Sequence, residues 1–331
     1  MGQAVDLVEV WRGDILESVH RGHAAICDDR GQIVQAWGDP ETVIFPRSSC
    51  KMVQALPLIE SGAADAAGLG TEQLALACAS HQGAALHTDR VSAWLAGLGL
   101  SDEDFRCGAH MPYDVATAHG LIRADESPCQ MHNNCSGKHS GFLTLNRHLK
   151  AGPDYIDLDH PVQMAVRTAF EDVTDQVSPG YGIDGCSAPN FATTLHGLAR
   201  AMGFFASAGD RSDTRSNAAA RLVQAMVAYP ELVGGEGKAD TELMRATGGR
   251  AAIKTGAEGV YVAIIPEKRL GIALKIVDGA TRASECAIAA ILIRLGMLEA
   301  AHPWAQKRLN APLINCRGVV CGHVRPAPTL T

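Results

Sequence analysis

The sequence has 331 residues, of which 47% are hydrophobic and 20% charged, and its 29 basic and 36 acidic residues leave a formal net charge of −7 at pH 7. This composition is typical of a globular protein of one large or two closely joined domains, and it excludes an intrinsically disordered chain. Nucleic acid and anionic membranes are not expected as partners, because the sequence lacks the clustered Lys and Arg that they require.

The first residues, MGQAVDLVEVWRG, contain two acidic side chains and no basic n-region, so they do not resemble a secretory signal peptide. The most apolar run, residues 286–298, is interrupted by Arg294 and is expected to be a buried helix rather than a membrane span. A soluble cytoplasmic protein is therefore expected, with its ten cysteines reduced.

The N-terminal region is predicted to be rich in strands. Short runs of β-forming residues predict strands at 4–11, 15–20, 23–28 and 33–37, with a hairpin turn at 28–32. Apolar residues then recur at helical spacing from Met52 to Ile59, and Gly62 predicts the end of that helix. Ser48 therefore lies where a strand region passes into a helix. Residues 65–230 carry mainly helical patterns.

Strand patterns return near the C-terminus. They predict an antiparallel set at 251–256, 259–266 and 269–279, with PEKR as a turn, followed by an amphipathic helix over 281–298. The residues after Ala301 include several prolines, which favour an irregular tail.

These elements predict an α+β fold in which strands from both chain ends form one antiparallel sheet flanked by helices. We expect residues 1–331 to form a single catalytic unit. Within it, the sheet region with its flanking helices is expected at about 1–60 and 235–300, and a mainly helical lobe at about 65–230.

The segment MHNNCSGKH, residues 131–139, concentrates chemically active side chains. In a helix, Cys135 could share a face with His132 or with His139, because residues three or four apart lie on the same side, and cysteine and histidine are common zinc ligands. The serine and glycine that follow Cys135 instead indicate a turn, and no CxxC or HxxxH stands nearby to complete a metal site. Spacing alone leaves a metal site and a polar turn both open.

Ser48 and Lys51 form an S-x-x-K motif at the predicted strand-to-helix transition. One helical turn separates them, so the lysine amine could activate the serine hydroxyl as a nucleophile, provided that burial or nearby positive charge keeps the amine neutral. The apolar run MVQALPLI that follows offers such burial. The structural alternative is that Ser48 or Ser49 caps the helix while Lys51 extends into solvent.

The triplet K-T-G at 254–256 lies in a predicted strand. S-x-x-K followed by K-T-G is typical of the penicillin-recognising serine enzymes. Their S-D-N element is missing, but CASHQG at 78–83 places Ser80 in a polar loop. Ser80 and Lys254 could therefore form a second Ser-Lys unit; the alternative for Lys254 is a surface lysine entering a turn.

A Gly-rich loop, GYGIDGCSAP at 180–189, carries Asp184 and Cys186. Such a loop suits the close approach of a backbone to a ligand, and a plain turn is the alternative. The histidines outside the 131–139 segment show no ligand spacing, and structural roles are expected for most of them; they include His81, His87, His110 and His119.

Taken together and in order, several of these blocks resemble the Rhizobium-type, or class 3, L-asparaginases over about residues 7–298. The matching blocks are VHRGHA (19–24), FPRSSCKMVQALPLIESGAAD (45–65), LALACASHQG (74–83), RCGAH (106–110), HNNCSGKHSGFL (132–143), GIDGCSAP (182–189) and KTGAEGVY (254–261). The resemblance implies a fold similar to that of serine β-lactamases and penicillin-binding proteins, and a homodimer.

The resemblance implies catalytic roles for two Ser-Lys pairs. Ser48 would be the nucleophile with Lys51 as its base, and Ser80 with Lys254 would relay protons or assist the attack. The reaction implied is hydrolysis of L-asparagine to L-aspartate and ammonia through a serine acyl-enzyme.

The resemblance also implies a zinc ion, Zn²⁺, held by two cysteines and a lysine, which match Cys135, Lys138 and Cys186. It places three further residues around the substrate pocket: Arg47, His139 and Asp184.

Two other functions are weighed against the asparaginase. A β-lactamase-like or D,D-peptidase hydrolase is favoured by S-x-x-K with K-T-G, but the S-D-N element and an export signal are missing. A non-catalytic module that binds zinc or an amino acid would retain the pocket without turnover, and the presence of both serines and both lysines argues against it.

Overall fold

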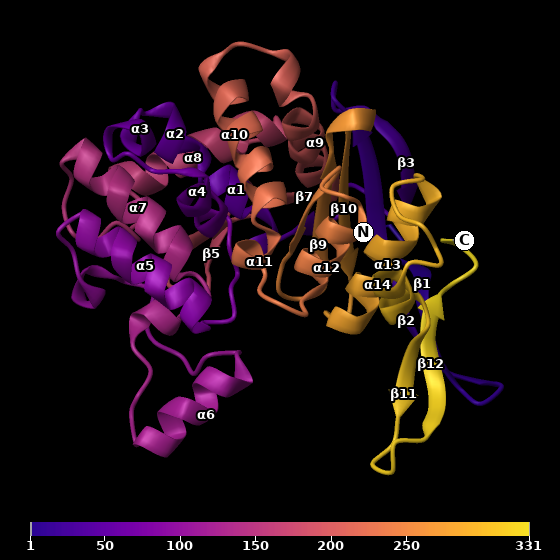
Figure 1. Cartoon of the computed structure of the whole chain (residues 1–331). Coiled ribbons are helices and arrows are strands. Elements are labelled where there is room, and N and C mark those ends of the chain that lie inside the picture. The colour runs from indigo at the N-terminus through magenta and orange to yellow at the C-terminus, as the bar shows by residue number, and fades with distance from the viewer. Residues whose placement is uncertain (1, 331) are drawn as a thin grey trace. The chain divides into compact units, whose positions relative to one another are not determined.

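The computed structural model describes residues 2–330, and these divide into two compact units (Figure 1). Unit 1 contains the described residues of Met1–Ser49, Thr193–Ser207 and Glu242–Thr331, and unit 2 contains Cys50–Ala192 and Ala208–Thr241. Each unit is therefore built from segments that are distant in the sequence.

Unit 1 is organised around one antiparallel sheet, which is eight-stranded among the described residues. Its order is β11-β12-β1-β2-β10-β9-β8, and β3 also pairs with β2. The strands are β1 (Val5–Arg12), β2 (Ile15–Asp28), β3 (Ile33–Trp37), β8 (Ala252–Thr255), β9 (Val260–Ile265), β10 (Leu270–Ile276), β11 (Ala311–Ile314) and β12 (Val320–Pro326). The pairing of β2 with β10 joins the N-terminal strands to the C-terminal ones, which confirms the predicted two-ended sheet.

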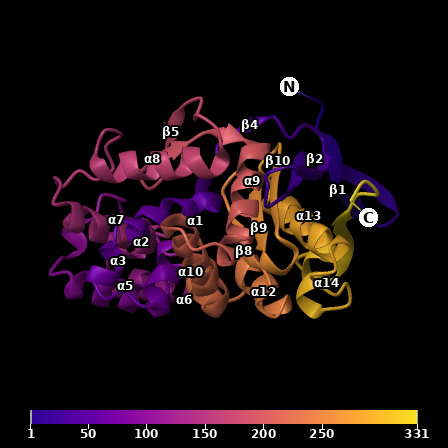
Figure 2. The ribbon, with the colours of Figure 1, turned by 90° about the horizontal axis from the view of Figure 1, so that it is seen from above.

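Helices cover both faces of this sheet. Figures 1 and 2 show α9 (Leu195–Ala206) on one side of β9 and β10 and α13 (Thr281–Arg294) on the other. The approach of α9 is close, since a Cβ at Gly271 would lie 2.1 Å from the backbone nitrogen of Gly203. Every residue of β9 is buried, so its near-continuous apolar sequence reflects burial on two faces.

The N-terminal strands follow the predicted pattern with one difference. Residues 15–20 and 23–28, predicted as separate strands, form the single strand β2. The predicted turn after it is present, with the Asp28 N–H donating to the Gln32 carbonyl at 2.9 Å. A short strand, β4 (Val43–Ile44), then pairs with β7 (Thr193–Thr194).

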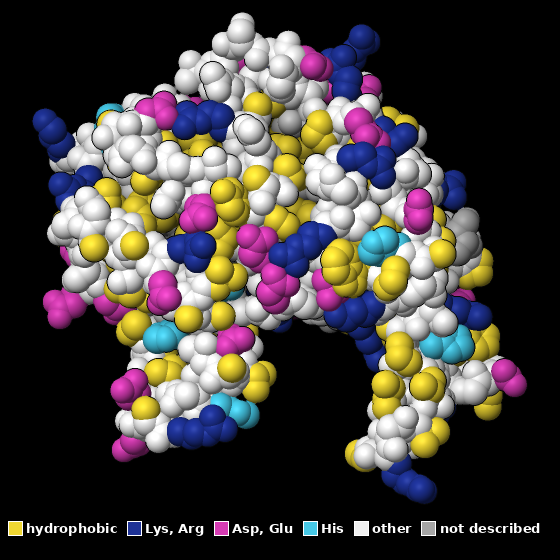
Figure 3. Space-filling model, viewed as in Figure 1, with side chains coloured by type: hydrophobic (Ala, Val, Ile, Leu, Met, Phe, Trp, Pro, Cys, Tyr) yellow, Lys and Arg dark blue, Asp and Glu magenta, His cyan; other side chains and the backbone are white. Residues whose placement is uncertain are grey.

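The predicted irregular tail is wrong. Residues after Ala301 form α14 (Pro303–Leu309) and the hairpin β11–β12, which extends the sheet beside β1. Pro303 occupies the first turn of α14, where its missing N–H costs nothing, and Pro312 lies in an edge strand, where a proline is tolerated. Hydrophobic side chains are exposed along this hairpin (Figure 3), including Ile314 and Val320.

Unit 2 is mainly helical. Its helices are α1 (Lys51–Gln54), α2 (Leu56–Glu60), α3 (Ala63–Ala66), α4 (Thr71–Ala77), α5 (Ala85–Gly97), α6 (Val115–Ala124), α7 (Ser136–Leu149), α8 (Pro161–Thr174), α10 (Thr214–Ala228) and α11 (Pro230–Val233), and a short hairpin joins β5 (Tyr181–Ile183) to β6 (Pro189–Phe191). Helix α7 is buried from Ser136 to Asn146 and packs against α4, α5 and α8. Helix α12 (Ala239–Ala246) runs across the division between the two units.

Among residues 2–330, no helix combines the length and the apolar character that crossing a membrane requires.

Candidate active site

Lys51 is the first residue of α1, and its side chain is only 1% exposed. Its amine donates to the carbonyl oxygen of Ala79 and lies 3.0 Å from the hydroxyl oxygen of Ser80 and 3.1 Å from the sulfur of Cys135. The alternative in which Lys51 extends into solvent is therefore wrong. A buried amine beside a hydroxyl and a thiol is an arrangement suited to proton transfer.

Cys135 immediately precedes α7. Its N–H donates to the side-chain oxygen of Asn133 at 2.8 Å, which fixes the chain as it enters the helix. The predicted turn at Ser136 and Gly137 is wrong, because both residues belong to the first turn of α7. Glycine is required for packing instead: a Cβ at position 137 would lie 2.3 Å from the carbonyl oxygen of Leu76. This close approach brings the start of α7 against the end of α4.

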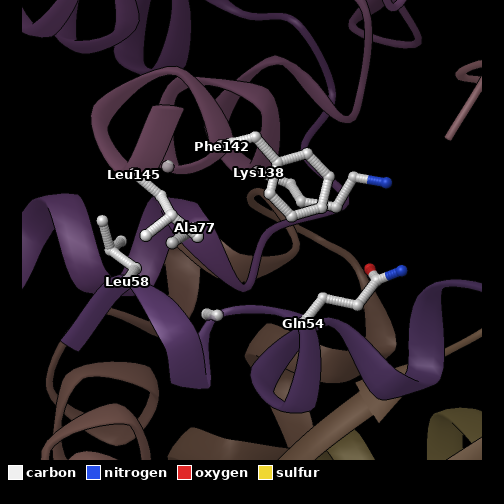
Figure 4. A pocket seen from close by; sticks show the side chains of 8 residues that line it. Gln54, Leu58, Ala77, Lys138, Phe142 and Leu145 are labelled. Atoms are coloured by element: carbon white, nitrogen blue, oxygen red, sulfur yellow. The ribbon is translucent and has the colours of Figure 1, made fainter. Parts of the chain in front are cut away.

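Lys138 lies on the first turn of α7, and its amine is 3.1 Å from the sulfur of Cys186. Its aliphatic stem borders a small pocket with Phe142, whose ring centroid is 5.2 Å from the amine (Figure 4). In Figure 4 the Lys138 nitrogen points away from the apolar side chains of Leu58 and Leu145. The stem is therefore packed among apolar groups while the amine is directed to the cysteines.

Cys186 lies in the turn that connects β5 to β6. The turn is closed by two hydrogen bonds, from the Ser187 N–H to the Asp184 carbonyl (2.8 Å) and from the Asp184 N–H to the Ala188 carbonyl (3.0 Å). Ser187 has a φ of 68°, and the bend directs Cys186 inward, where it is 3% exposed. The Gly-rich loop thus places a cysteine 48 residues from Lys138 beside its amine.

The pKa values of the two cysteines are shifted in opposite directions. A hydrogen bond from Cys135 lowers the pKa of Cys186 well below its usual value; burial opposes this shift, and the positive charge of Lys138 adds to it. The same hydrogen bond, followed by burial, raises the pKa of Cys135 well above its usual value. Burial is the largest influence on the pKa of Lys138 and acts to lower it, but nearby negative charge, chiefly that of Cys186, outweighs burial and raises that pKa. These shifts favour the thiolate form of Cys186 and the ammonium form of Lys138.

The types of donor atom in this cluster suit a zinc ion. Zinc prefers sulfur and nitrogen ligands, and a tetrahedral ion holds one of each roughly 3.5 Å apart, close to the 3.1 Å between the Lys138 amine and the Cys186 sulfur. Within the described part of the chain, no three His, Cys, Asp or Glu side chains are grouped so that they could hold a metal ion. A zinc ion bound here would therefore need Lys138 as a ligand.

Helical spacing suggested His132 or His139 as a metal ligand together with Cys135, but the two histidines have other environments. The Nδ1 of His132 accepts a hydrogen bond from the Cys129 N–H at 3.2 Å. This ring nitrogen therefore binds Cys129 rather than pairing with Cys135. His139 is fully buried (0% exposed), and burial lowers its pKa to about 4, so the ring is neutral at pH 7. Its Nδ1 lies 2.9 Å from the Tyr155 hydroxyl, whereas its buried Nε2 makes no hydrogen bond of normal geometry.

The remaining predicted site residues belong to unit 1. Ser48 and Arg47 lie in the short 3₁₀ helix η1 (Arg47–Cys50), and both side chains are half-buried. The neighbouring Ser49 is fully buried, and its hydroxyl donates to the carbonyl oxygen of Pro46 at 2.7 Å. Helix α1 begins without a side-chain cap. These observations distinguish Ser48, the more exposed of the two serines, from Ser49, whose hydroxyl stabilises the local turn.

The K-T-G strand lies against this same turn inside unit 1. A Cβ at Gly256 would be 2.6 Å from the Pro46 carbonyl oxygen and 3.2 Å from the Ser49 nitrogen. Lys254 precedes this contact in β8; it is 0% exposed, and its amine donates to the Thr255 carbonyl at 2.9 Å. The alternative of a surface lysine is therefore wrong for Lys254.

Some of these neighbours were not predicted from the sequence. The contact between Lys51 and Cys135 joins residues 84 positions apart, and no motif couples them. Tyr155, which bonds His139, also carried no local signal. Gly137 could have been recognised by its place in an otherwise helical pattern, where a glycine can mark close packing rather than a turn.

Several solved structures are distantly similar to this chain. One described as Mglu shares 12% identity, with a TM-score of 0.46, and the alignment covers 84% of this chain and 67% of that one. A putative β-lactamase from Bacteroides dorei DSM 17855 shares 11% identity over 77% of this chain and 84% of its own, with a TM-score of 0.39. A β-lactamase from Mycobacterium bovis shares 11% identity over 82% and 94%, also with a TM-score of 0.39.

The chain spans about two thirds of the length of the Mglu chains, from 62% to 67%. At such identities and TM-scores, these similarities establish no shared activity. A comparison with curated proteins found no match.

Membership of a family rests on a different comparison. The model of a family described as L-asparaginase II matches residues 8–326, which is nearly the whole chain and includes every residue of the clusters described above. The match agrees with the resemblance seen in the sequence blocks from Val19 to Tyr261. The chain therefore belongs to the L-asparaginase II family, a family of amidohydrolases.

Proposed function

We propose that this protein is an L-asparaginase that hydrolyses L-asparagine to L-aspartate and ammonia. The observation that carries the proposal is the buried amine of Lys51, three residues after Ser48 and 3.0 Å from the Ser80 hydroxyl, in a chain of this family. Lysine amines act as bases for serine nucleophiles where the site keeps them neutral.

In the proposed reaction, the Ser48 hydroxyl oxygen attacks the side-chain amide carbon of asparagine, and Lys51 accepts the hydroxyl proton. The proton is then passed to the leaving nitrogen, so that ammonia departs and an aspartyl ester remains on Ser48. Water hydrolyses this ester and restores the serine. Ser80 and Lys254 are proposed as the second Ser-Lys pair, which carries protons during these steps.

Substrate recognition is proposed to use charges of opposite sign. Arg47 would bind the α-carboxylate, since a guanidinium pairs with a carboxylate through two parallel hydrogen bonds, and Asp184 would bind the α-ammonium group. His139, neutral and buried, would present an uncharged ring edge to the same pocket. Glutamine should react more slowly, because one additional methylene moves its amide carbon away from the nucleophile.

Zinc is proposed as a cofactor held by Cys135, Lys138 and Cys186. When bound, it would supply a positive charge and a Lewis acid beside the substrate. Holding it requires Cys135 and Lys138 to release their protons, so zinc affinity should increase with pH. The family resemblance further suggests a homodimer, and the lack of a signal-like segment in the sequence suggests the cytoplasm; light scattering and cell fractionation can test these two proposals.

The direct test is ammonia release from L-asparagine by the purified protein. Ser48→Ala should lower kcat by at least ~10³-fold, since removing a serine nucleophile has effects of this size or larger. Ser49→Ala is the matched control: it removes the neighbouring hydroxyl, which bonds Pro46, and should retain most of the activity. If folded wild-type protein supplied with zinc releases no ammonia from asparagine, the proposal is wrong.

The S-x-x-K and K-T-G motifs also favour a second candidate, a β-lactamase-like hydrolase. Nitrocefin hydrolysis measured on the same preparation separates the two. We expect asparagine to be hydrolysed and nitrocefin to remain intact; the reverse result would favour the second candidate.

A further inference from the structure

His81 directly follows Ser80 in the loop between α4 and α5, and its side chain is fully buried (0% exposed). Its Nδ1 accepts the Gly83 N–H at 3.1 Å, and its Nε2 lies 2.9 Å from the Ser136 hydroxyl oxygen. That hydroxyl donates its single proton to the Met131 carbonyl at 2.9 Å. The His81 ring must therefore carry its proton on Nε2 and donate it to Ser136. Burial lowers the pKa of His81 well below its usual value, which agrees with a neutral ring.

The main chain around His81 is held from two directions. The His81 N–H donates to the Asn134 carbonyl at 3.1 Å, and the Ser80 N–H donates to the Val233 carbonyl at 2.9 Å. His81 thus contacts the segment before α7 twice, once through its main chain and once through its ring. Gly83 completes the contact, because a Cβ there would lie 2.7 Å from the His132 carbonyl oxygen.

A second histidine supports the ring of His81. The ring of His87 is stacked on it, with centroids 4.8 Å apart and an interplanar angle of 10°. His87 is itself anchored by its Nε2, which lies 3.0 Å from the Glu231 carbonyl oxygen. Burial is the largest cause that lowers the pKa of His87 as well, so the two neutral rings can stack without charge repulsion.

We propose that His81 is a positioning residue that holds Ser80 and Cys135 in a fixed arrangement around the Lys51 amine. Ser80 is its neighbour in the loop, and Cys135 is the neighbour of Ser136, the residue that accepts the ring hydrogen bond. The Lys51 amine is 3.0 Å from the Ser80 hydroxyl and 3.1 Å from the Cys135 sulfur. A shift between the two segments would therefore change both distances. The inference rests on the proposed function for its effect on catalysis.

The test compares His81→Gln, His81→Leu and Ser136→Ala. His81→Leu removes the ring donor and should lower kcat for asparagine by about 100-fold with little change in KM, because a displacement of about 1 Å at a catalytic group has this effect while substrate contacts remain. His81→Gln supplies an amide N–H near the position of Nε2 and should restore much of kcat. Ser136→Ala removes the acceptor and should reproduce the loss. His148→Leu, at an exposed position of the same helix α7, is the matched control.

Hydrogen–deuterium exchange provides a readout that does not depend on activity. Faster exchange is expected in His81→Leu at the amides of residues 79–82 and 135–139, and not in His148→Leu. The proposal is overturned if folded His81→Leu or Ser136→Ala keeps wild-type kcat and exchange, or if His81→Gln loses as much kcat as His81→Leu. If wild-type protein does not hydrolyse asparagine, the proposed function fails, and the exchange pattern alone then decides whether His81 joins the two segments.

Discussion

The buried polar cluster of unit 2 and the sheet of unit 1 use burial in opposite ways. In unit 2, two lysines, two cysteines and a histidine from α1, the start of α7 and the β5–β6 turn are almost fully excluded from solvent, including Lys51, Lys138 and Cys186. In unit 1, the central strands bury apolar side chains, and β9 is buried along its whole length. Buried apolar groups stabilise a fold, whereas buried polar groups cost free energy unless they are paired. Unit 2 therefore retains a cluster of buried polar groups that points to function, whereas the apolar core of the central strands stabilises unit 1.

The largest expected effect is on Lys51. Lys51→Met should lower kcat for asparagine by at least ~10³-fold, because it removes the proposed base, yet it should change the free energy of unfolding by no more than about 2 kcal/mol, because methionine retains most of the apolar stem. Steady-state ammonia assays and denaturant unfolding measure the two quantities.

The control for Lys51 is Lys275→Met in β10, where another lysine amine donates to a main-chain carbonyl, that of Glu258, at 2.7 Å. This variant should keep kcat close to that of the wild type. If the Lys51→Met protein kept a near-normal kcat, the buried polar cluster of unit 2 would not be needed for catalysis. Unit 2 would then not differ from unit 1 in the way proposed above.

A smaller effect on activity, and a specific one on metal binding, is expected at Cys186. Cys186→Ser should weaken zinc binding by at least ~100-fold, since even the loss of a group that only supports a metal ligand costs 10- to 100-fold. Competition with a chromogenic chelator measures the affinity. Cys316→Ser, at an exposed cysteine, should bind zinc as the wild type does. Equal affinities in the two variants would mean that the cysteine and lysine cluster holds no zinc.

The smallest effect on activity is expected from a substitution in the core of the unit 1 sheet. Leu274 lies in β10 and is 0% exposed, so Leu274→Ala should lower the free energy of unfolding by about 2–5 kcal/mol through lost burial and a cavity. The kcat per folded molecule should remain unchanged. Val277→Ala, whose side chain is 58% exposed in the wild type, should be nearly neutral in denaturant unfolding. A large loss of kcat in folded Leu274→Ala would show that the sheet also shapes the site.

The sheet was largely predictable because its signals are local. Alternating or continuous apolar runs predicted the strands that became β1, β3, β8, β9 and β10, and turn residues predicted the hairpin after Asp28. The C-terminal hairpin was not predicted, because the prolines in this part of the sequence indicated irregular structure. Whether Pro312 can belong to a strand depends on that strand lying at an edge, and only the pairing of β12 with β1 places it there.

The candidate site was predicted in parts. The S-x-x-K spacing of Ser48 and Lys51 is local, and the segment from 131 to 139 drew attention to Cys135. The roles of its neighbours were not local: His132 turns to Cys129, and Gly137 serves a close approach to Leu76 rather than a turn. Family resemblance, and not spacing, suggested that Lys138 joins Cys186.

The sequence by itself determined where most of the strands and helices form, which family the chain resembles and which residues carry reactive groups, because periodicity, turn chemistry and residue type are properties of short segments. Only the tertiary structure decided that Lys51 is buried, that its amine lies beside Ser80 and Cys135, and that the Cys186 sulfur lies beside the Lys138 amine. The physical reason is that burial and the distances between charges depend on which helices and loops pack together. Residues from separate segments acquire their protonation states only after those contacts have formed.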